Sequence, residues 1–402
     1  MSTPPNPYYP GTGREPGRAR SFWQRVTEGL EIQQLWGQFV AEAKASYGLY
    51  SKDVDWDEIK RERRKFKRFF RAAWALFQAM LMKLSPARRV LLLVALVLIV
   101  VQPEFQWGGQ RNQLNFQLGG IGAAILFLLL ALELADRVTM KRDLEIAREI
   151  QQWLVPSQPP FVPGFDIAFA TRPQNTVAGD YYDAFLRPLP AESAKPSLLV
   201  AVADVAGKSV PAALLMATFQ AGLRALSATP ESLEEIAAGL DRYARQHSLG
   251  GLRFTTAFLA EIDPDTHEMR YINAGHNNPI LRRPSGEIER LSAGGLPFGV
   301  PSDQEPTRAS GHVQLGVGDV LFIFTDGVIE AVDRQEQEFG EVRLIPVIQS
   351  APPESAADTL RRVMTQVNNF VGEARQHDDI TCFVLRVIPN IAGAQSPAAN
   401  PA

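Results

Sequence analysis

Short apolar or alternating runs of strand length recur through the C-terminal half of the chain, and they limit its fold more than any other feature. Helical segments near 210–228, 231–248 and 354–373 lie between some of them, and Pro230 with Glu231 is typical of a helix start. Many strands with a few inserted helices predict a β-sandwich whose helices pack on the outside. The runs are DIAFAT, SLLVAVAD, FTTAFLAEID, EMRYINA, DVLFIFTDG and DITCFVLRVI.

Two longer apolar runs precede this region. Residues 90–101, VLLLVALVLIVV, contain no polar residue, and residues 118–135, LGGIGAAILFLLLALELA, contain Glu133 as their one charged residue. Residues 102–117 are predicted to form a short polar turn between them, and the whole predicts a transmembrane helical hairpin; the alternative is a pair of buried core helices. The first run rises only about 18 Å as a helix, against a hydrocarbon core of about 30 Å, so its complete crossing stays open.

Basic residues flank both apolar runs on their outer sides. Residues 60–89 carry eleven Lys or Arg residues interleaved with Phe and Trp, which favours a membrane-surface helix over a nucleic-acid site. The excess of Lys and Arg on both flanks predicts that both termini and the C-terminal half lie in the cytoplasm, with the chain in the cell membrane. The basic residues after the second run are Arg137, Lys141, Arg142 and Arg148.

The composition excludes several other kinds of site. The chain has 41 Lys and Arg against 44 Asp and Glu, a net charge of −3, which argues against a dedicated nucleic-acid binder. One cysteine, Cys382, excludes a disulfide framework and a cysteine-rich zinc site, and we expect it in the core. The five histidines have no HExxH spacing, and the GxxxxGK[ST] and GxSxG motifs are absent.

Acidic residues stand at the ends of several predicted strands. Asp204 and Asp326 each end a strongly apolar run, and adjacent strands of a sheet can place such ends side by side. The alternative is that each Asp only caps a helix or starts a turn. The acidic turns are VAGDYYD with Asp180 and Asp183, VADVAG with Asp204, FTDGV with Asp326, and QHDDIT with Asp378 and Asp379.

Carboxylates crowded in this way repel one another, and a divalent cation removes the repulsion. A set of oxygen ligands suits Mg²⁺ or Mn²⁺ rather than zinc or copper. Two such ions sharing a central Asp would hold a water, lower its pKa and direct it at a phosphorus atom. Among the neighbours, His276 is a general acid or a loop-organising hydrogen-bonding group, His377 is an outer partner or exposed, and Lys208 attracts phosphate or begins a helix.

From about residue 145 to 387 the chain resembles the metal-dependent type 2C (PPM) serine/threonine protein phosphatases. It is most similar to their bacterial SpoIIE-like and RsbU-like branch. The motifs occur in the family's order: AREIQQWLVPSQPP, AGDYYDAF, VADVAGKSVPAALLMA, FTTAFLAEID, YINAGHNNP, GGLPFGV, GDVLFIFTDGVIEA, FGEVRL and DDITCFVLR. Small departures, such as Ala178 and Ser209 in place of glycine, remove no ligand. Some relatives carry a histidine where Ala206 stands, so water is left to protonate the leaving group.

The resemblance implies an α+β fold, an α-β-β-α sandwich of two antiparallel sheets flanked by helices, here preceded by the two-span hairpin. It implies two Mn²⁺ or Mg²⁺ ions, with Asp204 bridging them and Asp180 on the second. Asp326 and Asp378, with the backbone carbonyl of Val205, would hold the first. It also implies attack of an activated water on phosphoserine or phosphothreonine, and in this branch a phosphorylated anti-anti-sigma-type protein is a frequent substrate.

The chain therefore divides into six predicted segments. A charged helix at 136–154 has an apolar stripe that includes Ile150, Trp153 and Leu154, and we expect these groups to pack on something. The resemblance implies homodimer contacts there, and we expect the linker to control the enzyme. Two alternatives remain: a non-enzymatic membrane receptor or scaffold, and a hydrolase of small phosphomonoesters. The segments are a disordered N-terminus 1–20, a basic helical cytoplasmic region 21–88, the hairpin 89–135, the linker helix 136–160, the phosphatase domain 161–388 and a disordered tail 389–402.

Overall fold

The computed structural model divides into two compact units, Met1–Arg137 and Val138–Ala402. The predicted N-terminal segment 1–20 and all but the first residue of the predicted tail lie outside the described residues. The structure describes residues 64–101, 104–107, 114–187, 196–229, 231–248, 250–302, 308–350, 352 and 354–389.

The first unit contains a helical hairpin. Helix α5 (Pro86–Val101) and the first part of α6 (Gly119–Leu154) pack closely, since a Cβ on Gly122 would lie 2.8 Å from the carbonyl oxygen of Ala95. Arg88 Nη1 also pairs with Asp136 Oδ2 at 2.6 Å. Helix α4 (Lys65–Lys83) precedes α5.

One prediction for this unit needs correction. The stretch between the apolar runs is not a simple polar turn, because β1 (Glu104–Trp107) and β2 (Leu114–Gln117) pair there as an antiparallel hairpin. The predicted boundary between hairpin and linker helix falls inside α6, which is continuous over 36 residues, and it stays a prediction.

Among the described residues, one helix has both the length and the apolar composition of a candidate membrane span, and it is α7 (Val210–Ser227) of the second unit. Its residues Met216 and Leu223 are buried in a core cluster of the sandwich, so we interpret α7 as a core helix. The predicted transmembrane hairpin at 89–135 therefore stays a prediction.

The second unit is built on two sheets. The first has the strand order β10-β7-β6-β5-β4, with β11 also pairing β7, and the second has the order β3-β13-β12-β8-β9. All pairs are antiparallel except β10 with β7, which is parallel and corrects the prediction of purely antiparallel sheets. The strands are β3 (Phe165–Arg172), β4 (Tyr181–Arg187), β5 (Ser197–Val205), β6 (Thr255–Ile262), β7 (Glu268–Ala274), β8 (Ile280–Arg282), β9 (Ile288–Arg290), β10 (Gly294–Gly295), β11 (Gly311–Gln314), β12 (Val320–Phe324) and β13 (Ile380–Val387).

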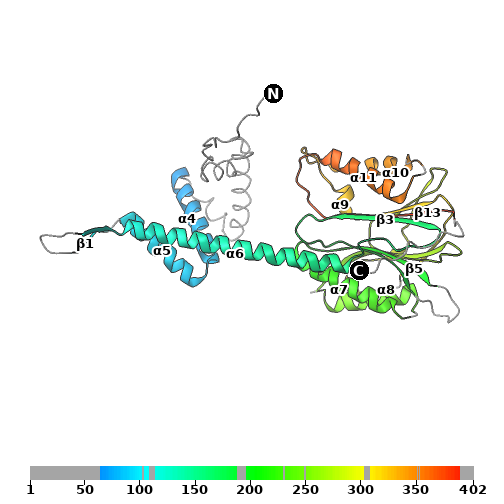
Figure 1. Ribbon diagram of the computed structural model, residues 1–402, viewed down its shortest axis with the longest axis horizontal. Helices are drawn as coiled ribbons and strands as arrows, with labels where there is room; N and C mark the ends of the chain where they lie inside the picture. Colours follow the sequence, from blue (N-terminus) through cyan, green and yellow to red (C-terminus); the bar gives the residue numbers. More distant parts are fainter. Residues whose placement is uncertain are drawn as a thin grey trace, which may run out of the picture. The chain divides into compact units, whose positions relative to one another are not determined.

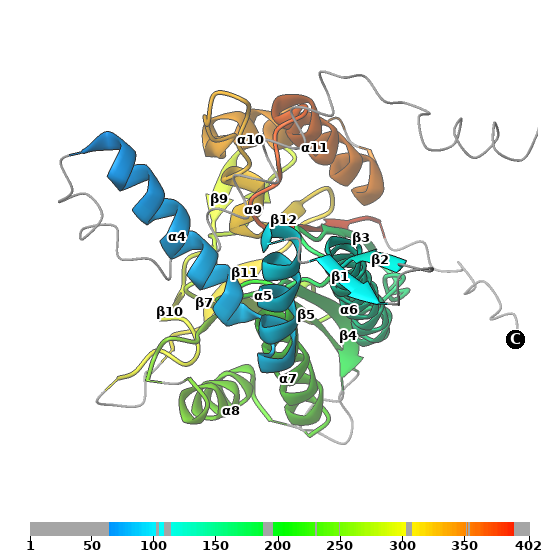
Figure 2. The same cartoon turned by 90° about the vertical axis from the view of Figure 1, so that its left-hand side faces the viewer.

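Helices cover the outer face of each sheet, so the predicted α-β-β-α layering is confirmed (Figure 1, Figure 2). Helices α7 and α8 (Leu233–Gln246) lie on the first sheet, and α9 (Asp326–Ile329), α10 (Gly340–Gln349) and α11 (Ala356–Val371) lie on the second. Strand β5 has apolar residues on both faces because alternate residues pack between the sheets and against α7 and α8. Helix α8 begins at Leu233 rather than at Pro230, because Ser232 and Glu235 form a capping box there.

Candidate active site

The ends of four chain segments meet at one end of the sandwich. The register of β4 with β5 sets Asp180 beside Asp204, where β5 ends. In the other sheet, the register of β12 with β13 sets Asp326, the first residue of α9, near Asp378. The two backbones approach closely, since a Cβ on Gly327 would lie 1.9 Å from the carbonyl oxygen of the residue after Asp378.

The carboxylates predicted as metal ligands perturb one another. Burial raises the pKa of Asp180 well above its ordinary value, and the charge of Asp204 raises it further. Burial, with the charges of Asp326 and Asp378, raises the pKa of Asp204 to about 7. Burial, with the charges of Glu330 and Asp378, raises the pKa of Asp326 to about 6. The structure therefore brings all four predicted aspartates into one electrostatic cluster.

Hydrogen bonds hold two members of this region in place. The hydroxyl of Thr325 donates to Asp180 Oδ2 at 2.9 Å. Asp379 accepts the backbone N–H groups of Gln174 and Gly179, each at 2.6 Å, and so fixes the loop that leads to Asp180. Sequence reasoning had no role for Thr325; its place directly before Asp326 at a strand end is the signal that was available.

Lys208 pairs with the fourth aspartate. Its Nζ lies 2.8 Å from Asp378 Oδ2 and donates to the carbonyl oxygen of His377 at 2.6 Å. Asp378 Oδ1 accepts the backbone N–H of Asp379 at 2.9 Å. Both carboxylate oxygens of Asp378 therefore already have a donor.

Three other residues considered from the sequence lie outside the cluster. Asp183 is fully buried and accepts hydrogen bonds from Tyr181 and Arg224, so it stabilises the fold. His276 is buried, its Nδ1 lies 3.0 Å from Thr256 Oγ1, and burial lowers its pKa to about 4, which favours a neutral hydrogen-bonding role. Cys382 is buried in the middle of β13, as predicted.

The donor set fits magnesium or manganese by its chemistry. As the side chains stand, no group of three His, Cys, Asp or Glu residues in the described part of the chain forms a ready-made metal site. Still, the donors are carboxylates, of which Asp180 is buried and the other three are partly buried. The ammonium of Lys208 offsets their negative charge at Asp378 and in part at Asp326. The carbonyl oxygen of Val205 also faces the same loop, since a Cβ on Gly179 would lie 3.3 Å from it. Such an oxygen-only, electron-rich set is one that these ions prefer.

The profile of the Stage II sporulation protein E (SpoIIE) family matches residues 195–388. These residues form a SpoIIE-type domain. The phosphoserine phosphatase RsbU of Bacillus subtilis (strain 168) is 29% identical over 249 residues, which are 61% of this chain and 70% of RsbU. The matches confirm the predicted family and the predicted enzyme class, a protein phosphatase.

Two further relatives extend the comparison. Protein IcfG of Synechocystis sp. (strain ATCC 27184 / PCC 6803 / Kazusa) is 27% identical over 309 residues, 68% of this chain, and the match spans only 47% of IcfG. The solved structure of the SiaA-PP2C domain of Pseudomonas aeruginosa has a TM-score of 0.52 at 20% identity, and the match covers 63% of this chain and 98% of that one. The SpoIIE-type domain thus shares the fold of a PP2C domain.

The end of α6 is attached to the loop that precedes Asp180. Gln151 Nε2 donates to the carbonyl oxygen of Ala178 at 2.7 Å, and the N–H of Ala178 donates back to Gln151 Oε1 at 2.9 Å. The end of α6 is therefore joined to the sandwich two residues from a cluster aspartate.

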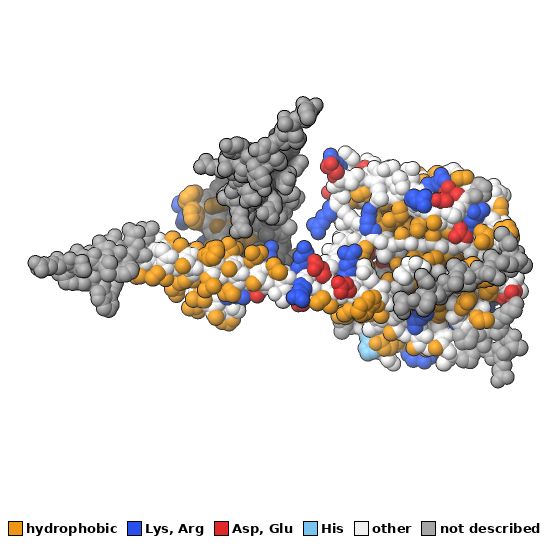
Figure 3. Space-filling view, viewed as in Figure 1, with side chains coloured by type: hydrophobic (Ala, Val, Ile, Leu, Met, Phe, Trp, Pro, Cys, Tyr) orange, Lys and Arg blue, Asp and Glu red, His pale blue; other side chains and the backbone are white. Residues whose placement is uncertain are grey.

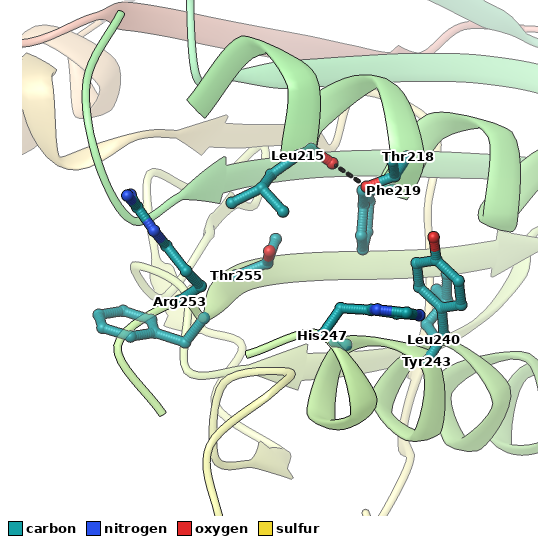
Figure 4. Close-up of a pocket in the computed structure, with 10 residues that line it drawn as sticks. Leu215, Thr218, Phe219, Leu240, Tyr243, His247, Arg253 and Thr255 are labelled. Atoms are coloured by element: carbon teal, nitrogen blue, oxygen red, sulfur yellow. Dashed lines mark hydrogen bonds between the residues drawn. The ribbon is translucent and has the colours of Figure 1, made fainter. Parts of the chain in front are cut away.

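An apolar cavity of about 260 Å³ lies between α7 and α8 of the SpoIIE-type domain (Figure 4). Leu215 and Phe219 line it from α7 and Leu240 from α8. Arg253 lines the cavity too and donates to the carbonyl oxygen of Ala206 at 3.4 Å. Since no carboxylate lines it, this cavity is not the catalytic centre.

Proposed function

We propose that this chain is a membrane-attached, metal-dependent phosphatase that hydrolyses phosphoserine or phosphothreonine in a regulatory protein. The observation that carries the proposal is the convergence of Asp180, Asp204, Asp326 and Asp378 at one end of the sandwich, most of which belongs to the SpoIIE-type domain. Buried carboxylates without enough neighbouring cations are costly to a fold, so their retention favours a catalytic role over a scaffold.

In this proposal Asp204 would be a ligand of both of two Mn²⁺ or Mg²⁺ ions, Asp180 would hold the second, and Asp326 and Asp378 would hold the first together with the carbonyl oxygen of Val205. The ions, when bound, supply a Lewis acid for the phosphoryl group and a water of lowered pKa. The chain itself orients these ligands, since Thr325 holds Asp180 and Asp379 holds the preceding loop.

The chain offers no obvious side-chain acid for the departing serine or threonine oxygen. Ala206 cannot donate a proton, and His276 is neutral, buried and already bonded to Thr256. Solvent water therefore protonates the leaving oxygen in this proposal. We therefore predict that phosphate release does not require a proton from His276.

Attachment to the cell membrane, with both termini and the phosphatase domain in the cytoplasm, belongs to the same proposal. Apolar side chains lie exposed along α5 and the first part of α6, including Val97, Val100, Phe127 and Leu130 (Figure 3). Helix α4 also exposes large apolar side chains, and its sequence carries Lys and Arg but no acid. An apolar hairpin preceded by a basic, aromatic helix supports contact with a lipid bilayer.

The substrate and the assembly belong to the same proposal. RsbU is named a phosphoserine phosphatase, which supports a phosphorylated protein substrate, here proposed to be of the anti-anti-sigma type. Trp153 is 80% exposed and Ile150 is 49% exposed on α6, so an apolar stripe on the linker helix is left for a partner. A second copy of this chain, paired through that helix, is the proposed partner.

The proposal is tested by phosphate release from a phosphoserine protein with Mn²⁺, with EDTA, and with the Asp204→Asn variant. We expect release with Mn²⁺ and almost none in the other two cases. A small phosphomonoester, p-nitrophenyl phosphate, tests the alternative of a small-molecule hydrolase. Equal activity in EDTA would overturn the metal-dependent mechanism, and absence of release under all conditions would favour the scaffold alternative.

A further inference from the structure

Lys208 joins the ends of the two sheets across the carboxylate cluster. It lies in the short loop between β5 of the first sheet and α7, whereas Asp378 and His377 precede β13 of the second sheet. The Lys208 ammonium contacts the Asp378 carboxylate at 2.8 Å and the His377 carbonyl oxygen at 2.6 Å. A single cation thus links two segments 169 residues apart.

This pair differs from the other contacts of the cluster. Among the ion pairs of the described residues, it is the one that involves a predicted metal ligand. The second oxygen of Asp378 is also engaged, since it accepts the N–H of Asp379. The lysine therefore supplies the positive charge beside Asp378 that a bound metal ion would otherwise supply.

A divalent ion bound to Asp378 would weaken the contact between this carboxylate and the ammonium. Two cations a few ångströms apart repel, and the repulsion is stronger where water is partly excluded. Asp378 is 35% exposed, and Lys208 is 53% exposed, so the lysine has solvent into which it can move.

We propose that Lys208 is an internal counter-ion that competes with the divalent metal for Asp378 and is released when the metal binds. In the metal-free protein its contacts hold the loop before α7 against the turn before β13. Metal binding breaks the contact of Lys208 with Asp378. The inference rests on the proposed metal-dependent function. Lys208 is a positioning residue in this account, because it acts on the metal through Asp378.

The loop that carries Lys208 has an unusual backbone conformation. Gly207 has φ 123° and Ser209 has φ 63°, and the second is a conformation that residues with a Cβ seldom adopt. A Cβ on Gly207 would lie 2.6 Å from Arg253 Nη1. The lysine side chain is long and half-exposed, so in this account it is the part that moves when the metal enters.

The test is a calorimetric titration with Mn²⁺ of the full chain, purified in detergent, stripped with EDTA and dialysed. Lys208→Met removes the charge and keeps the length of the side chain, and Lys208→Arg is the matched control that keeps the charge. We expect Lys208→Met to bind Mn²⁺ about tenfold more tightly than wild type, equivalent to about 1.4 kcal/mol. Lys208→Arg should bind about as tightly as wild type.

Thermal unfolding gives a second readout. Without metal, Lys208→Met should unfold at a lower temperature than wild type, and saturating Mn²⁺ should raise its Tm by more than it raises that of wild type. Lys208→Gln repeats both measurements if Lys208→Met does not fold. Equal or weaker Mn²⁺ binding in a folded, uncharged variant would overturn the inference alone. Failure of wild type itself to bind Mn²⁺ would overturn the proposed function as well.

Discussion

Asp180 and Asp183 stand three residues apart, both are buried, and their surroundings are opposite. Asp183 accepts two hydrogen bonds from Arg224 at 2.8 Å and one from Tyr181 at 2.5 Å, so its charge is compensated. Asp180 has a threonine hydroxyl for a donor and another carboxylate, Asp204, for a neighbour. The difference teaches that burial alone does not mark a site; burial of negative charge without a matching cation does.

The largest expected effect comes from Asp204→Asn. We expect phosphate release to fall at least about 100-fold, because loss of groups that merely support metal ligands already costs 10- to 100-fold. Activity is measured with a phosphoserine protein and saturating Mn²⁺. Activity within threefold of wild type would contradict the claim that the uncompensated carboxylates form the metal site.

The pH dependence of stability should follow from the same cluster. In the metal-free fold the pKa of Asp204 is about 7 and that of Asp326 about 6, above their ordinary value near 4. The folded state therefore binds protons more tightly than the unfolded state, and the free energy of unfolding should rise as pH falls from about 7 to about 4. For Asp204 the effect is on the order of 2–4 kcal/mol.

Denaturant titrations in EDTA at pH 5 and pH 8 measure this effect. Asp204→Asn is the control, because it should show a weaker dependence on pH. Excess Mn²⁺ should weaken the dependence as well, since it neutralises the carboxylates at high pH. A metal-free protein that is more stable at pH 8 than at pH 5 would contradict the account.

Asp183→Asn should act on stability rather than on chemistry. It leaves Arg224 without its charged partner, and since that arginine is partly exposed we expect a loss of about 1–3 kcal/mol. Activity per folded molecule should stay close to wild type below the unfolding transition. Thermal unfolding and activity measured on the same sample check both halves of this expectation.

The smallest expected effect is that of Thr325→Val. Loss of the hydroxyl removes the hydrogen bond to Asp180, and the N–H of Thr381 loses its acceptor. We expect about tenfold weaker Mn²⁺ binding and about 1 kcal/mol lower stability. Thr325→Ser keeps the hydroxyl and should restore the Mn²⁺ affinity; a serine variant as weak as the valine variant would point to packing instead.

The strand ends that carry the aspartates could be predicted from the sequence, because a strand buried on both faces is a continuous apolar run and β5 and β12 are of this kind. The cations that pair with the aspartates could not be predicted. The ion pairs of Arg224 with Asp183 and of Lys208 with Asp378 depend on how helices and sheets pack, and no local sequence pattern encodes that packing. Helix α10 was missed for another reason: it contains Pro346, which usually signals a helix end.

The most direct test of the central claim compares Mn²⁺ binding by calorimetry in wild type, Asp204→Asn and Asp183→Asn. The account predicts two ions per wild-type chain, loss of at least one in Asp204→Asn, and retention of both in Asp183→Asn. Unchanged stoichiometry and affinity in Asp204→Asn would contradict the claim that the uncompensated carboxylate cluster is the metal centre.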